Sequence, residues 1–114
     1  MTNKKTTQYY EAIYSEKENV RLEATKERSI ALATGWYSMV SALNAKSVAC
    51  AMGAVSVVKG VKGSWLVIAD WEYNGDRHIF KGVVIAQVDN EKVKANTWYE
   101  TRDGQLWENP NLGE

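Results

Sequence analysis

A chain of 114 residues has the size of one small domain, so a pair of catalytic domains is excluded. Its 14 basic and 14 acidic residues give a net charge of zero, which favours neither nucleic acid nor an anionic membrane as a partner. With a hydrophobic share of 45% the chain is expected to fold, and its one cysteine and one histidine exclude an intrachain disulfide and a cysteine and histidine metal cluster. We expect no cofactor and no metal ion.

Residues 1–19 are predicted to form an arm or a short amphipathic helix, because Tyr10, Ile13 and Tyr14 stand at helical spacing. They contain no apolar core long enough for a secretory signal peptide. Residues 29–45 carry no charge, but polar residues and a glycine interrupt them, and they fall short of the ~20 apolar residues of a membrane span. We therefore expect a cytoplasmic protein without a transmembrane helix.

Residues 20–63 are predicted to form a short β-solenoid of nine-residue repeats. From Ser29 the sequence divides into the rows SIALATGWY, SMVSALNAK, SVACAMGAV and SVVKGVKGS, and the preceding nine residues keep Ala24 in the same column. Within a row the period is two, which places small side chains on one strand face and larger apolar side chains on the other. We expect the small face to let adjacent coils approach closely and the larger face to be buried.

An α+β fold is the alternative prediction, with helices within residues 5–52 followed by an antiparallel sheet. Helical spacing is found for Ile30, Ala33, Tyr37, Val40 and Asn44. The β-branched residues and the glycines argue against such a helix. In the solenoid, Gly35, Gly53 and Asn44 are expected to supply positive φ angles at the turns.

Residues 64–114 are predicted to form a β-meander that caps the solenoid. Asn74-Gly75 and Asp103-Gly104 separate apolar runs, and both are typical of type I′ hairpin turns, whose two central residues have positive φ angles. The cap would cover a solenoid end whose unpaired amides invite aggregation. The meander, the repeats and the arm together would make one compact mainly β domain.

The order of these motifs resembles a known group of proteins. Rows of the form S-x-A-x-A-x-G precede KGVKGSWLVIADWEYNG, VDNEKVKANTWY and DGQL. Uncharacterised small repeat proteins of phages, prophages and gut bacteria are similar over residues 20–108, with a C-terminal GSW(L/I)V(L/I)A(E/D)W domain. The repeats also resemble the coiled β-roll of trimeric autotransporter heads. The resemblance implies a phage-encoded protein in the cytoplasm of a host bacterium, and it implies no catalytic residue.

No residue is expected to be catalytic, and the protein is not expected to be an enzyme. Cys50 stands in an apolar repeat column, which predicts a buried core residue. His78 follows a hairpin turn and is predicted to be a surface residue. Asp70 and Glu72 share one strand face, where most such pairs are solvated charges. The repeats hold no aspartate in residues 29–63, which excludes a calcium-binding nonapeptide solenoid.

Five tryptophans are too many for a core of this size to bury fully, so some are expected at a binding surface. The binding candidates are Trp36, Tyr37, Met39, Trp65 and Trp71. An equally open alternative is that these rings attach the meander to the solenoid. Lys59, Lys62 and Ser64 in KGVKGSW are candidates for anion binding, with a glycine-rich junction as the favoured alternative.

Three functions follow as expectations. The first is a non-enzymatic protein–protein interaction module, in the specific case a phage-encoded inhibitor of a host defence factor. The others are a structural or adhesive assembly protein and a small-ligand or nucleotide-binding protein. Because four rows make only about two coils, we expect a homo-oligomer, a dimer or a trimer, with Trp36, Tyr37, Met39 and Val40 at its interface. A host protein is the other expected partner; membranes and nucleic acid are not expected.

Overall fold

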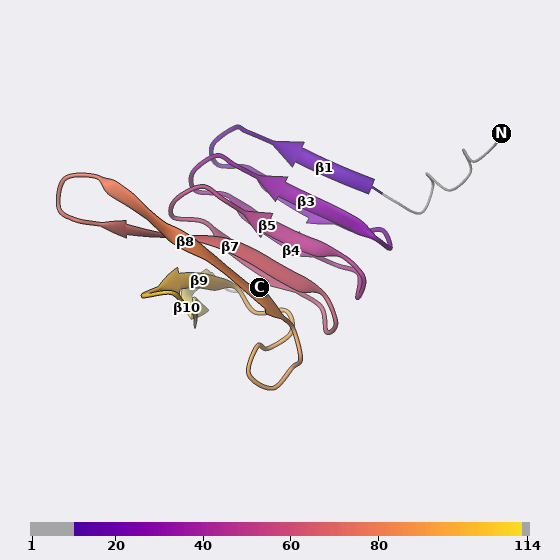
Figure 1. Cartoon of the computed structure of the whole chain (residues 1–114). Helices are drawn as coiled ribbons and strands as arrows, with labels where there is room; N and C mark the ends of the chain where they lie inside the picture. The colour runs from indigo at the N-terminus through magenta and orange to yellow at the C-terminus, as the bar shows by residue number, and fades with distance from the viewer. Residues whose placement is uncertain (1–10, 113–114) are drawn as a thin grey trace.

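The computed structural model describes residues 11–112 and is mainly β. Figure 1 shows stacked strands that form coils, followed by two hairpins. The strands are β1 (Glu11–Ser15), β2 (Arg21–Ala24), β3 (Ser29–Ala33), β4 (Met39–Ala42), β5 (Val48–Ala51), β6 (Val57–Gly60), β7 (Trp65–Tyr73), β8 (His78–Gln87), β9 (Tyr99–Arg102) and β10 (Gln105–Glu108), and a 3-10 helix, η2, spans Pro110–Leu112. This confirms the mainly β prediction and excludes the α+β alternative.

Residues 11–68 form a β-solenoid of about three turns. Glu11 pairs in parallel with Ser29, and Ile30 pairs with Val48, so one coil takes 18 residues, which is two of the nine-residue rows. Alternate rows therefore enter different sheets: β1, β3, β5 and β7 form one, here called sheet A, and β2, β4 and β6 form the other, sheet B. Consecutive rows face each other across the interior, and rows stack on their second neighbours.

The solenoid begins at Glu11, earlier than Val20, and the predicted N-terminal helix is wrong where the structure describes it. Residues 11–15 form β1, which pairs with β3 from Glu11↔Ser29 to Ser15↔Ala33. Pairing with the next coil overrides the local helical pattern because strand formation depends on cross-strand neighbours. The rest of the predicted arm, residues 1–10, lies outside the described residues.

The interior is filled by the small side chains, which reverses the predicted roles of the two faces. Ala31, Ala33, Ala49 and Ala51 are fully buried, and across from them Val40 and Val58 of sheet B are fully buried as well; these residues belong to one continuous core. Larger side chains such as Ile30 point outward and are exposed. The two sheets of a narrow coil lie too close together for large side chains on both inner faces, so alanine fills the interior.

The last coil compensates for a larger inner residue with a glycine. Leu66 and Ile68 replace the alanines of β5 in sheet A. Opposite them Gly60 takes the place of Ala42 in sheet B. A Cβ atom at Gly60 would lie 3.3 Å from Leu66 Cδ2 and 2.2 Å from the Ser64 hydroxyl. The volume added by Leu66 is thus balanced across the interior.

The corners of the coils differ from the expected glycine turns. Gly35, Gly53 and Asn44 do not have the expected positive φ. A Cβ atom at Gly53 would lie 2.1 Å from the carbonyl oxygen of Gly35, so glycine is needed there for the close approach of successive coils. The left-handed residues lie two positions later, at Tyr37 (φ 61°) and Val55 (φ 58°). Asn19, one coil earlier, has the same conformation.

Serine heads the rows because its hydroxyl closes the corner. Ser38 Oγ donates to the carbonyl of Gly35 at 2.8 Å, and Ser47 Oγ donates to the carbonyl of Asn44 at 2.6 Å. Both serines are buried, at 1% and 0% exposure. A side-chain hydroxyl that bonds a carbonyl three residues earlier satisfies a buried backbone acceptor where the chain changes direction.

Two hairpins, one on each sheet, cap the C-terminal end of the solenoid in place of one continuous meander. β8 pairs with β7 in sheet A, whereas β9 joins β6 of sheet B through Val58↔Tyr99 and pairs with β10. The Asp103-Gly104 turn has the two positive φ angles of a type I′ turn. At Asn74-Gly75 only the glycine has a positive φ, because the connection is a four-residue loop whose amides bond the Asn74 side chain.

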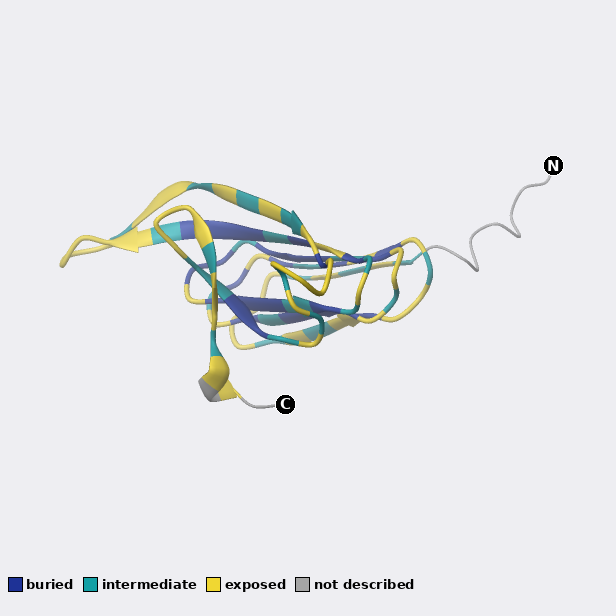
Figure 2. Cartoon of the chain, turned by 90° about the horizontal axis from the view of Figure 1, so that it is seen from below, coloured by how far each residue is buried: buried dark blue, intermediate teal, exposed yellow. Residues whose placement is uncertain are grey.

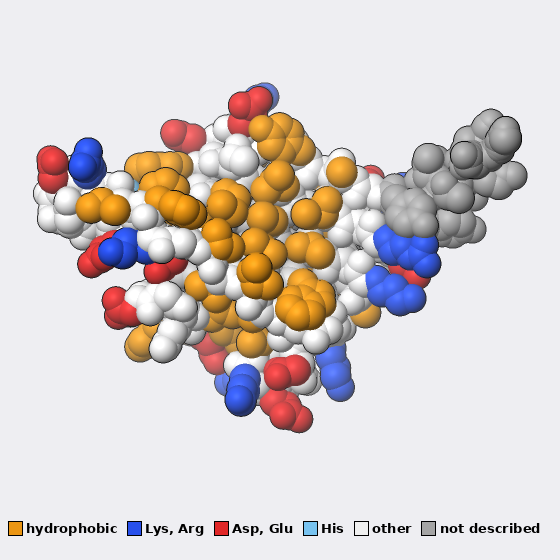
Figure 3. Space-filling model, in the orientation of Figure 1, with side chains coloured by type: hydrophobic (Ala, Val, Ile, Leu, Met, Phe, Trp, Pro, Cys, Tyr) orange, Lys and Arg blue, Asp and Glu red, His pale blue; other side chains and the backbone are white. Residues whose placement is uncertain are grey.

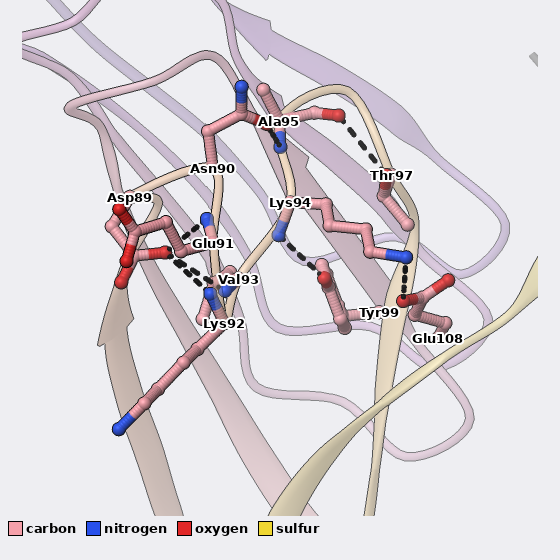
Figure 4. Close-up of polar contacts among 10 residues, drawn as sticks. All are labelled: Asp89, Asn90, Glu91, Lys92, Val93, Lys94, Ala95, Thr97, Tyr99 and Glu108. Carbon is pink, nitrogen blue, oxygen red and sulfur yellow. Dashed lines mark hydrogen bonds and ion pairs between the residues drawn. The ribbon is translucent and has the colours of Figure 1, made fainter.

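The loop between β8 and β9 carries the chain from sheet A to sheet B, and Figure 4 shows its polar contacts. Asp89 Oδ1 accepts hydrogen bonds from the amides of Glu91, Lys92 and Val93 at 2.9 to 3.0 Å. The Tyr99 hydroxyl accepts from the Lys94 amide at 2.7 Å. In Figure 2 the buried residues lie between the sheets, while the hairpin ends and this loop are exposed.

Candidate functional site

The outward side chains of sheet A form a continuous uncharged surface, here called the apolar face. Strand register aligns them in two columns that cross all five strands. One column is Ala12, Ile30, Val48, Trp65 and Gln87, and the other is Tyr14, Leu32, Cys50, Val67 and Ile85. Figure 3 shows hydrophobic side chains gathered over this side of the molecule, with charged groups around its margin.

The apolar face is open to solvent at several large side chains. Ile85 is 63% exposed, Tyr14 57%, Trp65 43% and Ile30 36%. Cys50 lies near the middle of the face but is only 9% exposed, and burial raises the pKa of its thiol. The prediction of a buried Cys50 is confirmed, although by strand alternation with Ala49 and Ala51 its side chain points away from the interior.

The outer face of sheet B is different because a tryptophan covers it. Trp98 is 3% exposed, and its ring lies 4.7 Å from Lys59 Nζ and 5.6 Å from the Arg21 guanidinium carbon. Arg21 belongs to β2 and Lys59 to β6, so the ring spans the middle strand β4 between two cations. Sheet B therefore carries charge and a cover on its outside, whereas sheet A carries neither across its two columns.

A second feature is a cavity of about 390 Å³, here called the corner pocket, which lies where the β7–β8 hairpin passes a corner of the solenoid. Two successive coil corners contribute Tyr37 and Val55. The hairpin, which projects beyond the coils in Figure 1, contributes Trp71, Tyr73 and His78. The remaining wall comes from β9 and the segment after β10, with Glu100, Thr101, Asn109 and Leu112 among its residues.

Aromatic rings on one side of the corner pocket pack together. His78 lies between Trp36, at a ring centroid distance of 4.8 Å, and Tyr73, at 5.0 Å. Trp71 lies 6.3 Å from Trp36, and its indole Nε1 donates to the carbonyl of Met52 at 3.0 Å. These contacts fix the orientation of the rings that line the cavity.

Another part of the lining of the corner pocket is polar and is held by a small hydrogen-bond network. Glu100 Oε1 accepts from Asn109 Nδ2 at 2.9 Å, and Glu100 Oε2 accepts from Arg102 Nε at 2.8 Å. Among the described residues that line this cavity, Glu100 is the one carboxylate, and none is a lysine or an arginine. The pocket thus combines aromatic surface with fixed hydrogen-bond acceptors.

The structure brings four of the five binding candidates together. Tyr37, Met39 and Trp71 line the corner pocket, and Trp36 packs behind Trp71 and His78. Trp65 lies apart, in a column of the apolar face. The predicted oligomer interface is wrong in one respect: Val40 is fully buried between the sheets and is not available to a partner.

Two of the three anion-binding candidates make structural contacts, and the third is exposed. Ser64 is fully buried, and its hydroxyl donates to the carbonyl of Val61 at 2.7 Å. The Lys59 ammonium lies over the Trp98 ring. Lys62 is exposed at the junction before β7. The favoured alternative, a junction where the chain turns from β6 into β7, agrees with this arrangement.

The residues considered for catalysis, Asp70, Glu72 and His78, also make structural contacts. Asp70 is 7% exposed, and its Oδ2 accepts from the amide of Gly104 at 2.9 Å, which ties β7 to the turn between β9 and β10. Glu72 forms an ion pair with Lys81 at 3.6 Å. His78, predicted to be a surface residue, is partly exposed and packs against the rings of Trp36 and Tyr73.

Sequence reasoning missed the contribution of Tyr73, Glu100 and Asn109 to a pocket. Tyr73 and His78 flank the four-residue turn of one hairpin, so that turn predicts that they lie close together. Glu100 lies in β9 of the other sheet and Asn109 follows β10, and no local pattern predicts that β9 lies beside β7.

Comparison of the chain with protein-family models, with curated proteins and with solved structures gave no match. In the described part of the chain, no group of three or more histidine, cysteine, aspartate or glutamate side chains is placed to hold a metal ion. Within residues 11–112, no helix is long and apolar enough to cross a membrane.

Proposed function

We propose that this protein is a non-enzymatic protein–protein interaction module whose contact surface is the apolar face. The observation that carries the proposal is the alignment of ten uncharged residues in two columns across five strands. Soluble proteins seldom expose a continuous apolar surface unless it meets a partner. The covered outer face of sheet B is the internal contrast, because there Trp98 shields the corresponding strands.

The partner that fits this surface is a second copy of the chain. The chain has no net charge, and neither column contains a charged residue, so two copies meet without electrostatic repulsion. Two sheet faces can pack about 10 Å apart with interlocking side chains. A two-fold axis would place the same columns on both sides of the contact, which makes the surface complementary to itself.

The size of the apolar face fits a small two-fold contact. Five strands about 4.8 Å apart and about five residues long, at about 3.3 Å per residue, make a face of about 400 Å². A pair of such faces covers about 800 Å², which matches a weak, reversible dimer and not an obligate one. Trp65 and Tyr14 add aromatic side chains of the kind that dominate contact energies.

Non-enzymatic function is supported by the roles of the reactive side chains. The Cys50 thiol is buried in the apolar face, and its pKa is raised by that burial, so little thiolate is present near neutral pH. His78 packs between Trp36 and Tyr73. The more specific prediction, an inhibitor of a host defence factor, depends on the sequence resemblance and stays a prediction.

Sedimentation equilibrium of the full chain at micromolar concentrations tests the proposal. We expect a dimer for the wild type, and for Ile85→Lys a dissociation constant raised at least about a hundredfold, because the two-fold contact would bury two unpaired ammonium groups. Trp107→Lys is the control: Trp107 is 47% exposed on β10, outside the apolar face, and the variant is expected to remain dimeric. A wild type that sediments as a 12.8 kDa monomer at every concentration would overturn the self-association.

A further inference from the structure

The corner pocket is lined by two unlike kinds of side chain, which restricts the chemistry of a ligand. Trp71 and Tyr73 contribute aromatic surface, and Glu100 and Asn109 contribute polar groups. Its volume of about 390 Å³ falls in the range of small-molecule sites. A matching molecule has an apolar face and a polar edge.

The charges of the lining residues restrict the class of ligand further. An anion would meet the Glu100 carboxylate, and within residues 11–112 the lining offers no lysine or arginine to attract it. A cation would meet a carboxylate that already accepts hydrogen bonds from Arg102 and Asn109. Neutral hydroxyl groups remain favourable, because carboxylate oxygens have further lone pairs and hydrogen bonds to a charged acceptor are stronger than those between neutral groups.

We propose that the corner pocket binds a neutral saccharide. A pyranose ring has apolar C–H faces, which suit Trp71 and Tyr73, and a rim of hydroxyl groups, which suits Glu100 and Asn109. This binding site is independent of the apolar face, whose columns contain none of these residues.

The pocket is also prepared for a ligand before binding. The Trp71 ring is held by its hydrogen bond to the Met52 carbonyl. The His78 ring packs between Trp36 and Tyr73. Rings held in this way lose little conformational entropy on binding.

The experiment is an NMR titration of the full ¹⁵N-labelled chain, observed through its five indole N–H signals. The probes are the methyl glycosides of glucose, galactose, mannose and N-acetylglucosamine, with choline and acetate as charged comparison ligands. We expect at least one glycoside to shift the Trp71 signal, identified with Trp71→Phe, in a saturable manner. Choline and acetate are expected to leave it unchanged.

Substitutions then locate the site. Tyr73→Ala and Glu100→Gln are each expected to weaken glycoside binding about tenfold, the effect of losing one stacking surface or one charged acceptor. Tyr14→Ala is the matched control, because Tyr14 is 57% exposed on the apolar face and Tyr73 is 59% exposed at the pocket. Circular dichroism verifies that each variant is folded.

Three results would overturn the saccharide site. They are the absence of a saturable shift with all four glycosides, tighter binding of choline or acetate than of any glycoside, and an equal loss of binding in Tyr14→Ala and Tyr73→Ala. Ile85→Lys separates the two proposals: it is expected to abolish the dimer and to keep glycoside binding. Retained binding in this variant supports the pocket even if self-association fails.

Discussion

Ser38 and Ser41 are both 1% exposed, but their hydroxyl groups differ in hydrogen bonding. Ser38 Oγ donates to the carbonyl of Gly35, whereas Ser41 Oγ has no partner among the described residues. We expect Ser38→Ala to lower the free energy of unfolding by about 1 to 2 kcal/mol and Ser41→Ala to leave it unchanged or raise it by up to about 1 kcal/mol. Urea unfolding of both variants measures the difference, and equal losses would contradict the assignment.

Glycine and serine at the corners show what single residues in a sequence can reveal. The repeat of Ser38 and Ser56, and of Gly35 and Gly53, was visible and predicted the turns. The sequence does not show why glycine is needed at these corners. A glycine required for a positive φ angle and a glycine required for the close approach of two coils look alike in a sequence. The left-handed residue of the later corner is Val55, which β-branching would have ruled out.

At the scale of one element, the loop after β8 depends on a single carboxylate. Hydrogen bonds from the amides of Glu91 and Val93, together with that of Lys92, hold the pKa of Asp89 below its ordinary value of 3.8. The folded state therefore favours the ionised form, and this contribution is complete above the unfolded pKa. It is lost as the pH falls below about 4 through the lowered pKa.

We expect the urea midpoint of the wild type to fall more between pH 5 and pH 3 than that of Asp89→Asn. The asparagine oxygen can still accept hydrogen bonds, but it does not titrate in this range. Fluorescence-monitored unfolding at several pH values measures both curves, and the other carboxylates cancel in the comparison. Parallel curves for the two proteins would show that Asp89 does not contribute to the pH dependence.

The strands of the solenoid could be predicted, whereas the face that each strand buries could not. The alternation with period two in SIALA and in SVACA correctly predicted the strands β3 and β5. Both faces of these strands are uncharged, so hydrophobicity does not say which one is inside. The choice follows from the distance between sheets A and B, which the sequence expresses only through the alanines and Gly60. For the same reason, the sequence predicts that the larger apolar side chains lie inside the coil, whereas the structure places those of sheet A on the outside, where they form the apolar face.

Of the candidate sites, the aromatic residues close together in sequence were found and the distant ones were missed. Trp36 and Tyr37 stand out in the sequence as bulky residues in a row of small ones. Glu100 reaches the same cavity only because β9 pairs with β6 across the end of the solenoid. Such a contact joins residues far apart in the chain, and no local periodicity reports it.

At the scale of the whole molecule, charge distinguishes the first coil from the coil that follows it. Residues 11–28 contain five acidic and four basic residues, and residues 29–45 contain none. The strands of this coil, β1 and β2, are the terminal strands of the two sheets at the end opposite the hairpins. Charged side chains beside a terminal strand oppose edge-to-edge association. The molecule therefore directs contact toward the apolar face and away from this end.

The final prediction concerns the 18-residue coil, which differs from the nine-residue period seen in the sequence. Stability in solenoids is approximately a sum over coils and the contacts between them. Duplicating residues 29–46 directly after Lys46 adds one complete coil, keeps every later strand in its sheet, and should raise the melting temperature by several degrees. Duplicating only residues 38–46 moves β5 and all later strands to the opposite sheet, so that the corner at Gly53 no longer stacks on the corner at Gly35, against which it is closely packed. We expect this shorter insertion to abolish cooperative unfolding, measured by thermal circular dichroism. If both insertions melted cooperatively above the wild type, the nine-residue row, and not the pair of rows, would be the structural unit.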